Sequence, residues 1–365
     1  MSTVIATIVG ARPQFIKASV VSKKIKEYAD LKEIIIHTGQ HYDYGMSEVF
    51  FDELEIPHPD YNLNIGSGKQ GEQTGKMLEK IESLLLELKP DLLVIYGDTN
   101  STLAGALASA KLHIPIAHIE AGLRSFNKKM PEEINRIVAD HCAEFLMAPT
   151  QTAVNNLKNE AISENKIFLT GDVMYDSALF FGKLSDTKST ICNTLNLENN
   201  NYILATVHRQ ENTDDNENLR IIFSAFIEIS SQIPVILPLH PRTKKNLQRI
   251  GMNDFGNNLK IIDPVGYLDM IQLEKNAKLI ATDSGGVQKE AYFYKVPCIS
   301  LRTETEWVEL VESGWNKIVP PKDINFVVEE IRKSLNFVQR DYQYFYGKGD
   351  AAGEIVEIIS NRFIK

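Results

Sequence analysis

Cysteine is scarce in this sequence of 365 residues. The three cysteines, Cys142, Cys192 and Cys298, are too few and too widely spaced for a disulfide framework or a zinc site. We therefore expect a protein with reduced thiols and no bound metal. No GxxxxGK[ST] sequence occurs, which excludes a Walker phosphate loop. No run of about 18 apolar residues occurs either, so we expect no membrane-spanning helix.

A basic excess is also missing. Acidic residues outnumber basic ones by 48 to 39, which gives a net charge of −9 and makes a nucleic-acid partner improbable. The first ten residues lack the basic region and cleavage site of a secretory signal, so we expect a cytoplasmic protein. Hydrophobic residues make up 43% and charged residues 24%, the balance of a globular protein, and the length favours two domains.

Short apolar runs alternate with amphipathic stretches along the chain. Runs of this length, bounded by Gly, Pro or Asp, suit strands that are buried on both faces of a parallel sheet. The segment 71–88 between two of them has helical spacing. The alternation predicts an α/β fold with doubly wound sheets. The predicted strands of the first half are 4–9, 33–37, 91–96, 115–119 and 145–148.

The pattern restarts in the second half, which predicts a second Rossmann-like domain and ligand binding at the carboxyl ends of the strands. A polar, Asn-rich stretch, 183–201, marks a boundary just before or within it. The predicted division is 1–172 and 173–345, followed by a C-terminal segment, 346–365, that carries a helix at 351–360. The predicted strands of the second half are 202–207, 235–239, 260–262, 279–281 and 298–301.

Two strand-to-helix turns have the composition of anion sites. The first, residues 10–17, places Arg12 and Lys17 at a helix N-terminus, whose free N–H groups and dipole favour an anion. The second begins Asp283-Ser284-Gly285-Gly286, where the glycines admit a phosphate, and Glu290 one turn later is placed to accept from ribose hydroxyls. A plain βα turn or a plain helix cap fits each motif alone, but the matched pair favours a nucleotide diphosphate.

Carboxylates gather at neighbouring strand ends in the first half. Asp98 and Glu120 each follow a predicted strand, and Glu132 begins a helix on which Asn135 and Arg136 share its face. Acids that converge in this way suit proton transfer at carbon, because burial and mutual repulsion raise a carboxyl pKa toward neutrality. A cap or a salt bridge explains each acid by itself.

Histidine and arginine follow two strands of the second half. His208 and Arg209 end one strand, where they are placed to protonate and hold a leaving phosphate, and His240 repeats the position one strand later. A single histidine in a loop is usually only solvated, so the repetition carries the argument.

Taken in order, these motifs resemble the non-hydrolysing UDP-N-acetylglucosamine 2-epimerase family. They cover nearly the whole chain, and the set is specific although single pieces are not. The resemblance implies a glycosyltransferase-B-like fold whose C-terminal helix crosses back to the first domain, a homodimer, and no nicotinamide or metal cofactor. The motifs are GARPQFIK (10–17), TGQH (38–41), GDT (97–99), HIEAGLRS (118–125), PEEINR (131–136), HRQEN (208–212), DSGGVQKEA (283–291) and GKGDAAGEIVEI (347–358).

The family eliminates UDP across C1–C2 to a 2-acetamidoglycal and then adds it back with inverted C2. Carried over residue by residue, the resemblance implies that Asp98, Glu120 and Glu132 act as acids and bases at C2. The residues implied to assist and hold the diphosphate are Lys17, His208, Arg12 and Arg209. Those implied to bind the rest of the UDP-sugar are Arg136, His240, Ser284, Gly285, Gly286 and Glu290.

One segment departs from the usual family pattern. Residues 303–309 read TETEWVE where the family commonly has an arginine and a proline in place of Trp307 and Val308. This version resembles the branch that epimerises UDP-2,3-diacetamido-2,3-dideoxy-glucuronate for bacterial surface polysaccharides such as O-antigen lipopolysaccharide. Arg242 or Arg302 would then face the C6 carboxylate, with Trp307 near the 3-acetamido group.

Four other functions remain open from the sequence. The first is epimerisation of UDP-N-acetylglucosamine itself. The second is a hydrolysing epimerase, the third is a UDP-sugar glycosyltransferase on the same fold, and the fourth is a non-catalytic nucleotide-sugar sensor. Three acids at matching positions argue against a transferase, because transfer needs at most one base near the acceptor.

Overall fold

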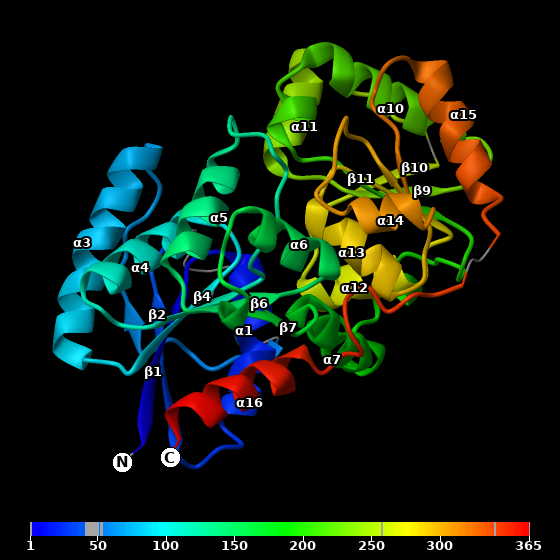
Figure 1. Ribbon diagram of the computed structural model, residues 1–365. Helices are drawn as coiled ribbons and strands as arrows, with labels where there is room; N and C mark the ends of the chain where they lie inside the picture. The colour runs from blue at the N-terminus through cyan, green and yellow to red at the C-terminus, as the bar shows by residue number, and fades with distance from the viewer. Residues whose placement is uncertain (1, 41–50, 52–53, 257, 339–340, 365) are drawn as a thin grey trace. The chain divides into compact units, whose positions relative to one another are not determined.

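The computed structural model describes residues 2–40, 51, 54–256, 258–338 and 341–364 (Figure 1). The chain divides into two compact units: unit 1 is Met1–Phe180 with Tyr344–Lys365, and unit 2 is Phe181–Gln343. The boundary falls inside helix α7 (Val173–Lys188), which begins where the predicted division lies. The stretch predicted to be a polar boundary is therefore helical as far as Lys188.

Unit 1 contains a parallel sheet of seven strands in the order β3-β2-β1-β4-β5-β6-β7. Ten of the thirteen strands in the two sheets were predicted, and all ten predictions are confirmed; β3 and β7 here were not predicted. The strands are β1 Thr3–Val9, β2 Leu31–His37, β3 Tyr61–Asn62, β4 Leu92–Tyr96, β5 Ile116–Ile119, β6 Phe145–Ala148 and β7 Ile167–Leu169. The other helices of this unit are α1 Arg12–Ile25, α3 Gln70–Leu88, α4 Asn100–Lys111, α5 Pro131–Cys142, α6 Gln151–Asn159 and α16 Ala351–Phe363.

Unit 2 repeats the plan with six parallel strands in the order β10-β9-β8-β11-β12-β13. Here β13 was not predicted. The strands are β8 Ile203–Thr206, β9 Val235–Pro238, β10 Leu259–Ile262, β11 Leu279–Thr282, β12 Cys298–Ser300 and β13 Asn316–Ile318. The helices are α8 Ile191–Thr194, α9 Gln210–Thr213, α10 Asn216–Ser230, α11 Pro241–Arg249, α12 Tyr267–Lys275, α13 Gly285–Phe293, α14 Val308–Glu312 and α15 Ile324–Leu335.

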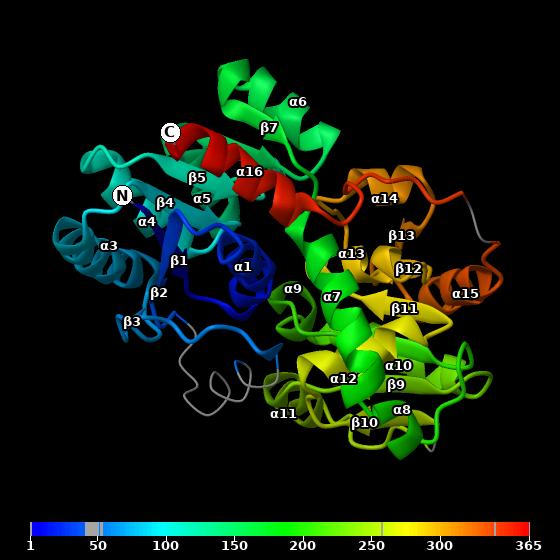
Figure 2. The same cartoon turned by 90° about the horizontal axis from the view of Figure 1, so that it is seen from below.

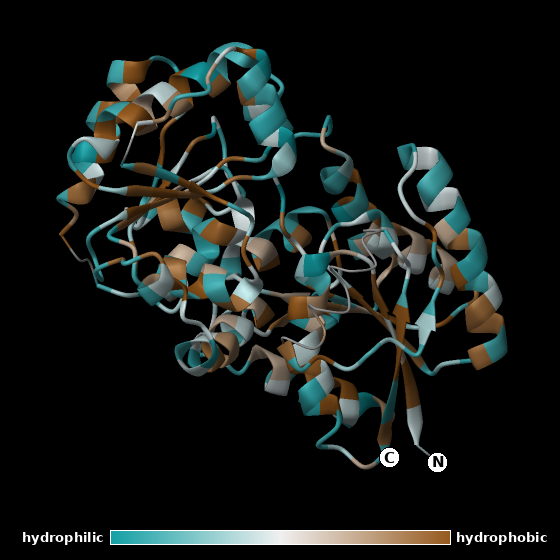
Figure 3. Ribbon diagram, turned by 180° about the vertical axis from the view of Figure 1, so that it is seen from behind, coloured by the Kyte–Doolittle hydropathy of each residue, from teal (hydrophilic) through white to brown (hydrophobic). Residues whose placement is uncertain are grey.

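The central strands are apolar because helices cover both faces of each sheet, as the brown strands of Figure 3 show. In unit 2, α10 and α15 pack on one face and α12 and α13 on the other. In unit 1, α16 packs on α1 (Figures 1 and 2), and the Thr3 hydroxyl donates to the Phe363 carbonyl at 3.4 Å. The two chain ends therefore both belong to unit 1. In the described part of the chain, no helix is long and apolar enough to cross a membrane.

Strand order also locates the ligand end of each unit. The order reverses between β1 and β4 in unit 1 and between β8 and β11 in unit 2. In doubly wound sheets, ligands bind at the carboxyl ends of the strands at such a reversal. Most of the motifs singled out in the sequence follow these four strands or the next one along, whereas PEEINR and GKGDAAGEIVEI belong to the helices α5 and α16.

Candidate active site

The turn after β1 is built around Gly10 and Gln14. A Cβ on Gly10 would lie 2.0 Å from the Ser101 hydroxyl oxygen, so only glycine fits there. The Gln14 amide oxygen accepts from the N–H groups of Gly10 and Ala11 at 2.8 and 3.1 Å, and its amide nitrogen donates to the Tyr96 carbonyl. The predicted anion site at this helix start therefore already has two of its N–H groups bonded by a side chain. Arg12, the first residue of α1, is half-buried.

Lys17 and Glu120 form a buried ion pair at the carboxyl edge of the unit 1 sheet. Glu120 follows β5 with a φ of 72°, a left-handed conformation that non-glycine residues rarely adopt and that is commonest at functional sites. Gly97, between β4 and Asp98, makes room for the pair. A Cβ there would lie 3.0 Å from Glu120 Oε2 and 3.5 Å from Lys17 Nζ.

Asp98 is bound from helix α5. Its Oδ2 lies 2.6 Å from Arg136 Nη2, and its backbone carbonyl accepts from the Asn135 amide at 2.8 Å. The structure thus brings Asp98 and Arg136 together, and Asn135 with them, as the shared helical face predicts. Through Gly97, this group lies next to the pair of Lys17 and Glu120.

The two glutamates at the start of α5 differ. Glu132, predicted as a catalytic acid, is exposed, whereas Glu133 is buried and was not predicted. Glu133 accepts from the backbone N–H groups of Ser125 and Phe126, both at 2.9 Å, and from Arg136. Burial raises the pKa of Glu133, but these hydrogen bonds outweigh burial and the pKa lies below its ordinary value. Glu133 therefore stays ionised and anchors Arg136.

In unit 2, a buried aspartate organises the turn after β8. Asp283, 0% exposed, accepts from the backbone N–H groups of His208 and Arg209 and from the Asn212 amide, at 3.0–3.1 Å. The exposed His208 ring lies beside it, with 3.6 Å between Nδ1 and Oδ1. Asp283 belongs to a motif that the sequence pointed to, but its anchoring role was not predicted.

Helix α13 begins at the glycine pair. The Ser284 hydroxyl caps it by accepting from the Val287 N–H at 3.5 Å, and Gly285 and Gly286 form its first turn. Glu290 lies one turn later and is 6% exposed, with the Tyr267 hydroxyl donating to it at 2.9 Å. The order Ser284, Gly285, Gly286 and Glu290 along one helix start is the geometry that the phosphate and ribose prediction requires.

The unusual segment 303–309 packs on the start of this helix. Trp307 is 4% exposed, and its indole N–H donates to the Gly285 carbonyl at 3.0 Å. Glu306 lies so close that a Cβ on Gly285 would be 2.4 Å from its Oε1. Glu306 also binds Arg302 at 3.0 Å and lies 3.9 Å from Arg209. Trp307 is therefore buried against the α13 N-terminus, and Arg302 is already paired with Glu306.

His240 and Arg242 lie at the start of α11 and are exposed. His240 Nδ1 accepts from the Arg242 N–H at 3.2 Å, so this histidine caps the helix. The Arg242 guanidinium contacts both oxygens of Asp214 at 2.7 Å. Neither of these two contacts involves a residue at the start of α13.

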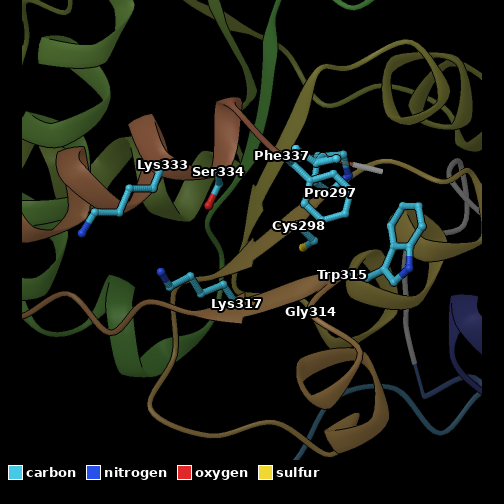
Figure 4. A pocket seen from close by; sticks show the side chains of 9 residues that line it. Pro297, Cys298, Gly314, Trp315, Lys317, Lys333, Ser334 and Phe337 are labelled. Carbon is cyan, nitrogen blue, oxygen red and sulfur yellow. The ribbon is translucent and has the colours of Figure 1, made fainter. Parts of the chain in front are cut away.

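A cavity of about 520 Å³ lies elsewhere in unit 2, among β12, β13 and α15 (Figure 4). Lys317 and Lys333 approach it from one side and Phe337 and Pro297 from the other, and both lysines pair with Glu330. None of the predicted site residues lines it, so we do not place the reaction there.

Within the described ranges, no three His, Cys, Asp or Glu side chains are grouped as a metal site requires. His37 and His41 do have HxxxH spacing, but His37 ends strand β2 instead of lying on a helix, and His41, with the end of the TGQH motif, lies outside the described residues.

Known proteins match this chain over almost its full length. A protein from Methanococcus maripaludis, named UDP-N-acetylglucosamine 2-epimerase homolog, is 58% identical over 98% of this chain and 99% of its own. The UDP-2,3-diacetamido-2,3-dideoxy-D-glucuronate 2-epimerase of Pseudomonas aeruginosa is 52% identical with the same coverage. The crystal structure of UDP-GlcNAc 2-epimerase from Methanocaldococcus jannaschii, in complex with UDP-GlcNAc and UDP, superposes with a TM-score of 0.90 at 45% identity, covering 98% of this chain and all of that one.

The family profile described as UDP-N-acetylglucosamine 2-epimerase matches residues 23–360. This match begins near the end of α1, so it omits β1, and it includes all the candidate residues except Arg12 and Lys17, which precede it. The chain therefore belongs to the UDP-N-acetylglucosamine 2-epimerase family, a family of isomerases.

Proposed function

We propose that the protein inverts C2 of a UDP-2-acetamido sugar without hydrolysing it. The observation that carries this proposal is the carboxylate pair at the ends of β4 and β5, where Asp98 is held by Arg136 and Glu120 by Lys17. Proton transfer at an unactivated carbon needs positioned carboxylates that are not free to rotate. Membership of an isomerase family supports the same chemistry.

In the proposed reaction, a carboxylate takes the C2 proton, the C1–C2 double bond forms, and the C1–O bond to the diphosphate breaks. UDP then adds back to C1 while a proton reaches C2 from the opposite face. Asp98, Glu120 and the exposed Glu132 would share the two proton transfers. Lys17 would exchange its bond with Glu120 for one with the departing diphosphate, as the negative charge develops there.

The start of α13 would hold the UDP. The backbone N–H groups of its first turn, the cap Ser284 and the two glycines suit a phosphate, and Glu290 suits the ribose hydroxyls. His208, Arg209 and Arg12 would bind and protonate the leaving group. For Arg209 to do so, the diphosphate must compete with the carboxylate of Glu306, which now lies 3.9 Å away.

UDP-2,3-diacetamido-2,3-dideoxy-glucuronate is the substrate that we propose. The 52% identical relative carries that name, and the substituted segment at Trp307 forms part of the α13 start instead of a remote loop. Arg302, whose Nε has no hydrogen-bond partner within the described residues, would share its guanidinium between Glu306 and the C6 carboxylate. A second candidate substrate is UDP-N-acetylglucosamine, because relatives with that name are 46% identical.

Incubation with each UDP-sugar in D2O, without an acceptor and followed by NMR, tests both levels of the proposal. Faster appearance of a manno-configured, C2-deuterated UDP-uronate supports the proposed substrate. Preference for UDP-N-acetylglucosamine would replace it by the second candidate. Release of free sugar, or no change with either substrate, would contradict the non-hydrolysing epimerase itself.

We further propose a cytoplasmic homodimer that supplies a manno-configured sugar for a surface polysaccharide. The family resemblance supports the homodimer, and the substrate of the 52% identical relative supports the polysaccharide. Light scattering of the purified protein would measure the mass directly. A mass near the 41.1 kDa of one chain would contradict the homodimer.

A further inference from the structure

His118 lies in the middle of strand β5 and is completely buried, with both ring nitrogens bonded. Nδ1 lies 2.7 Å from Asp140 Oδ1, and Nε2 lies 2.7 Å from the carbonyl oxygen of Gly97. A carbonyl oxygen only accepts hydrogen bonds, so Nε2 must carry a hydrogen. The state of Nδ1 then depends on whether Asp140 is ionised.

Asp140 is buried and has three partners. Its Oδ2 lies 2.7 Å from Arg124 Nη1 and accepts from the Gly122 N–H at 3.1 Å, while Oδ1 faces His118. Burial raises the pKa of Asp140, but the charges and hydrogen bonds of His118 and Arg124 outweigh burial and lower it below the ordinary value. Asp140 is therefore an ionised carboxylate that Arg124 and the Gly122 N–H hold in place, and Nδ1 of His118 is bonded to its other oxygen. Asp140 and, through it, Arg124 are the charged groups that reach the ring.

The Gly97 carbonyl connects the His118 ring to both proposed catalytic carboxylates. Gly97 is bonded to β5 on both sides: its N–H donates to the Ile119 carbonyl at 3.0 Å and its carbonyl accepts from His118. Asp98 is the next residue along the chain. Glu120 lies two residues after His118, and its Oε2 rests against the bare Cα of Gly97.

The turn at Glu120 has a backbone conformation that needs an external restraint. Glu120 has a φ of 72°, whereas the φ of 59° at Gly97 is one that glycine adopts freely. Left-handed conformations at non-glycine residues cost roughly 1–3 kcal/mol and persist only where surrounding contacts enforce them. A rigid ring that is bonded at both nitrogens provides such a contact, and it spans from the β4 turn to helix α5.

Resting on the proposed function, we propose that the buried His118 ring, held by Asp140, is a positioning residue that fixes the Gly97–Asp98 turn and so sets the spacing of the two carboxylates. It is not a catalytic residue, because both nitrogens are bonded inside the protein and the ring has no exposed surface. Its effect therefore belongs to kcat, since misplaced reacting groups slow the chemistry, while UDP binding residues in unit 2 are untouched.

The proposal is tested first on the wild-type protein by NMR with 15N-labelled histidine. We expect one histidine ring N–H that exchanges slowly with solvent, because the bond from Nε2 to the Gly97 carbonyl is buried, and we expect this signal to disappear in His118→Gln. The absence of such a protected ring N–H in the wild type would overturn the proposal, whether or not the protein turns over a UDP-sugar.

The second test is kinetic. His118→Gln should lower kcat about 10- to 100-fold, with KM for the UDP-sugar changed less than about threefold. Asp140→Asn, which leaves the Nε2 bond to Gly97 possible but removes the ionic partner, should lower kcat less. His141→Gln, an exposed histidine on the same helix as Asp140, is the matched control and should behave as wild type.

Wild-type kcat in His118→Gln would overturn the positioning role, and so would a loss confined to KM. If His118→Gln fails to fold, Asp140→Asn and the wild-type NMR measurement still decide. If the wild-type protein epimerises neither UDP-sugar, the proposed function fails, whereas the NMR measurement still shows whether the buried His118 ring N–H is bonded to Gly97.

Discussion

The buried cationic side chains among the candidate residues form ion pairs with carboxylates of the same unit. Lys17 contacts Glu120, Arg136 contacts both Asp98 and Glu133, and Arg302 contacts Glu306. A buried charge that loses its partner is destabilising, so the two members of each pair hold one another in place until a competing ion replaces one of them. In the proposed site, an incoming diphosphate or carboxylate would therefore bind by exchange with a carboxylate of the protein, instead of filling an open positive site.

Arg302 tests this idea through substrate choice. Replacing the pair together, as Arg302→Met with Glu306→Gln, removes both charges without leaving one unpaired. We expect kcat/KM for the diacetamido-uronate to fall at least about tenfold more than that for UDP-N-acetylglucosamine, because a charge-assisted hydrogen bond to the C6 carboxylate is lost. Arg242→Met, on the exposed pair with Asp214, is the control and should leave the ratio within about twofold. Equal losses on both substrates would contradict a carboxylate-reading role for Arg302.

Glu274 is a buried acid with a different status. Neither of its carboxyl oxygens has a hydrogen-bond partner within the described residues. Burial, and then the charge of Glu290, raise its pKa well above the ordinary 4.5. The folded state therefore holds a proton that the unfolded chain releases, so this group destabilises the fold increasingly as the pH rises above 4.5.

Glu274→Gln removes that linkage. We expect the variant to be more stable than wild type by about 1–3 kcal/mol at pH 8, and the difference to vanish below about pH 4.5. Denaturant titrations across this pH range measure it. Glu198→Gln, an exposed acid in the same unit, should give no pH-dependent difference. A stability loss in Glu274→Gln that grows as the pH rises would show instead that the carboxyl is needed in its ionised form.

At the scale of elements, burial decides what the sequence reveals. Eight of the ten predicted strands are buried almost throughout, whereas β2 and β10 are partly exposed, and each of the ten was found within two residues of its predicted bounds. The missed strands β3, β7 and β13 all lie at sheet edges, and their residues are partly exposed, so their apolar pattern is weak. Strand ends likewise predicted where Asp98, Glu120, His208 and Ser284 would lie.

Partners between elements were not predictable. Glu133, Asp140 and Asp283 are each buried acids that bind backbone N–H groups of another turn. A sequence shows that an acid is present, but it does not show which turn the fold will bring against it. For the same reason Glu132 was chosen on α5, although its neighbour Glu133 is the one that is buried.

The docking of helix α16 depends on one such acid. Asp176 of α7 accepts from the Ala352 N–H at 2.9 Å, at the start of α16. Burial, together with the charges of Asp172 and Asp350, raises the pKa of Asp176 to about 6 against the opposing effect of the hydrogen bonds from Ala352 and Ala351. Since the folded pKa is raised, the stabilising contribution of protonation is lost as the pH rises through 6.

Between pH 7 and pH 5 the wild type should therefore gain about 1 kcal/mol in the stability of α16 relative to Asp176→Asn. Hydrogen exchange followed by mass spectrometry reports it as slower exchange in peptides of residues 351–363 at pH 5, after correction for the intrinsic pH dependence. Peptides of α3, which Asp176 does not contact, provide the control within the same experiment. Equal protection changes in both proteins would assign the docking to apolar packing alone.

At the scale of the whole molecule, the two units carry different parts of the proposed reaction. The carboxylates for C2 lie in unit 1, whereas the phosphate and ribose residues after β8 and β11 lie in unit 2. The overall charge of −9 does not oppose an anionic substrate, because each of these groups acts over a few ångströms and salt screens longer-range repulsion within about 8–10 Å. The division of labour predicts that binding and chemistry can be separated by substitution.

Glu120→Gln should lower kcat by at least about 100-fold, because it removes a proposed proton-transfer group. Its Kd for UDP should stay unchanged or fall, since Lys17 loses its competing carboxylate. Glu290→Gln and Arg209→Met should instead weaken UDP at least about tenfold, as each removes a charged partner of the ligand. Calorimetry with UDP and deuterium exchange at C2 measure the two properties separately. If Glu120→Gln weakened UDP as strongly as Arg209→Met does, the chemistry and the nucleotide would share one set of residues, and the assignment of roles to the two units would be wrong.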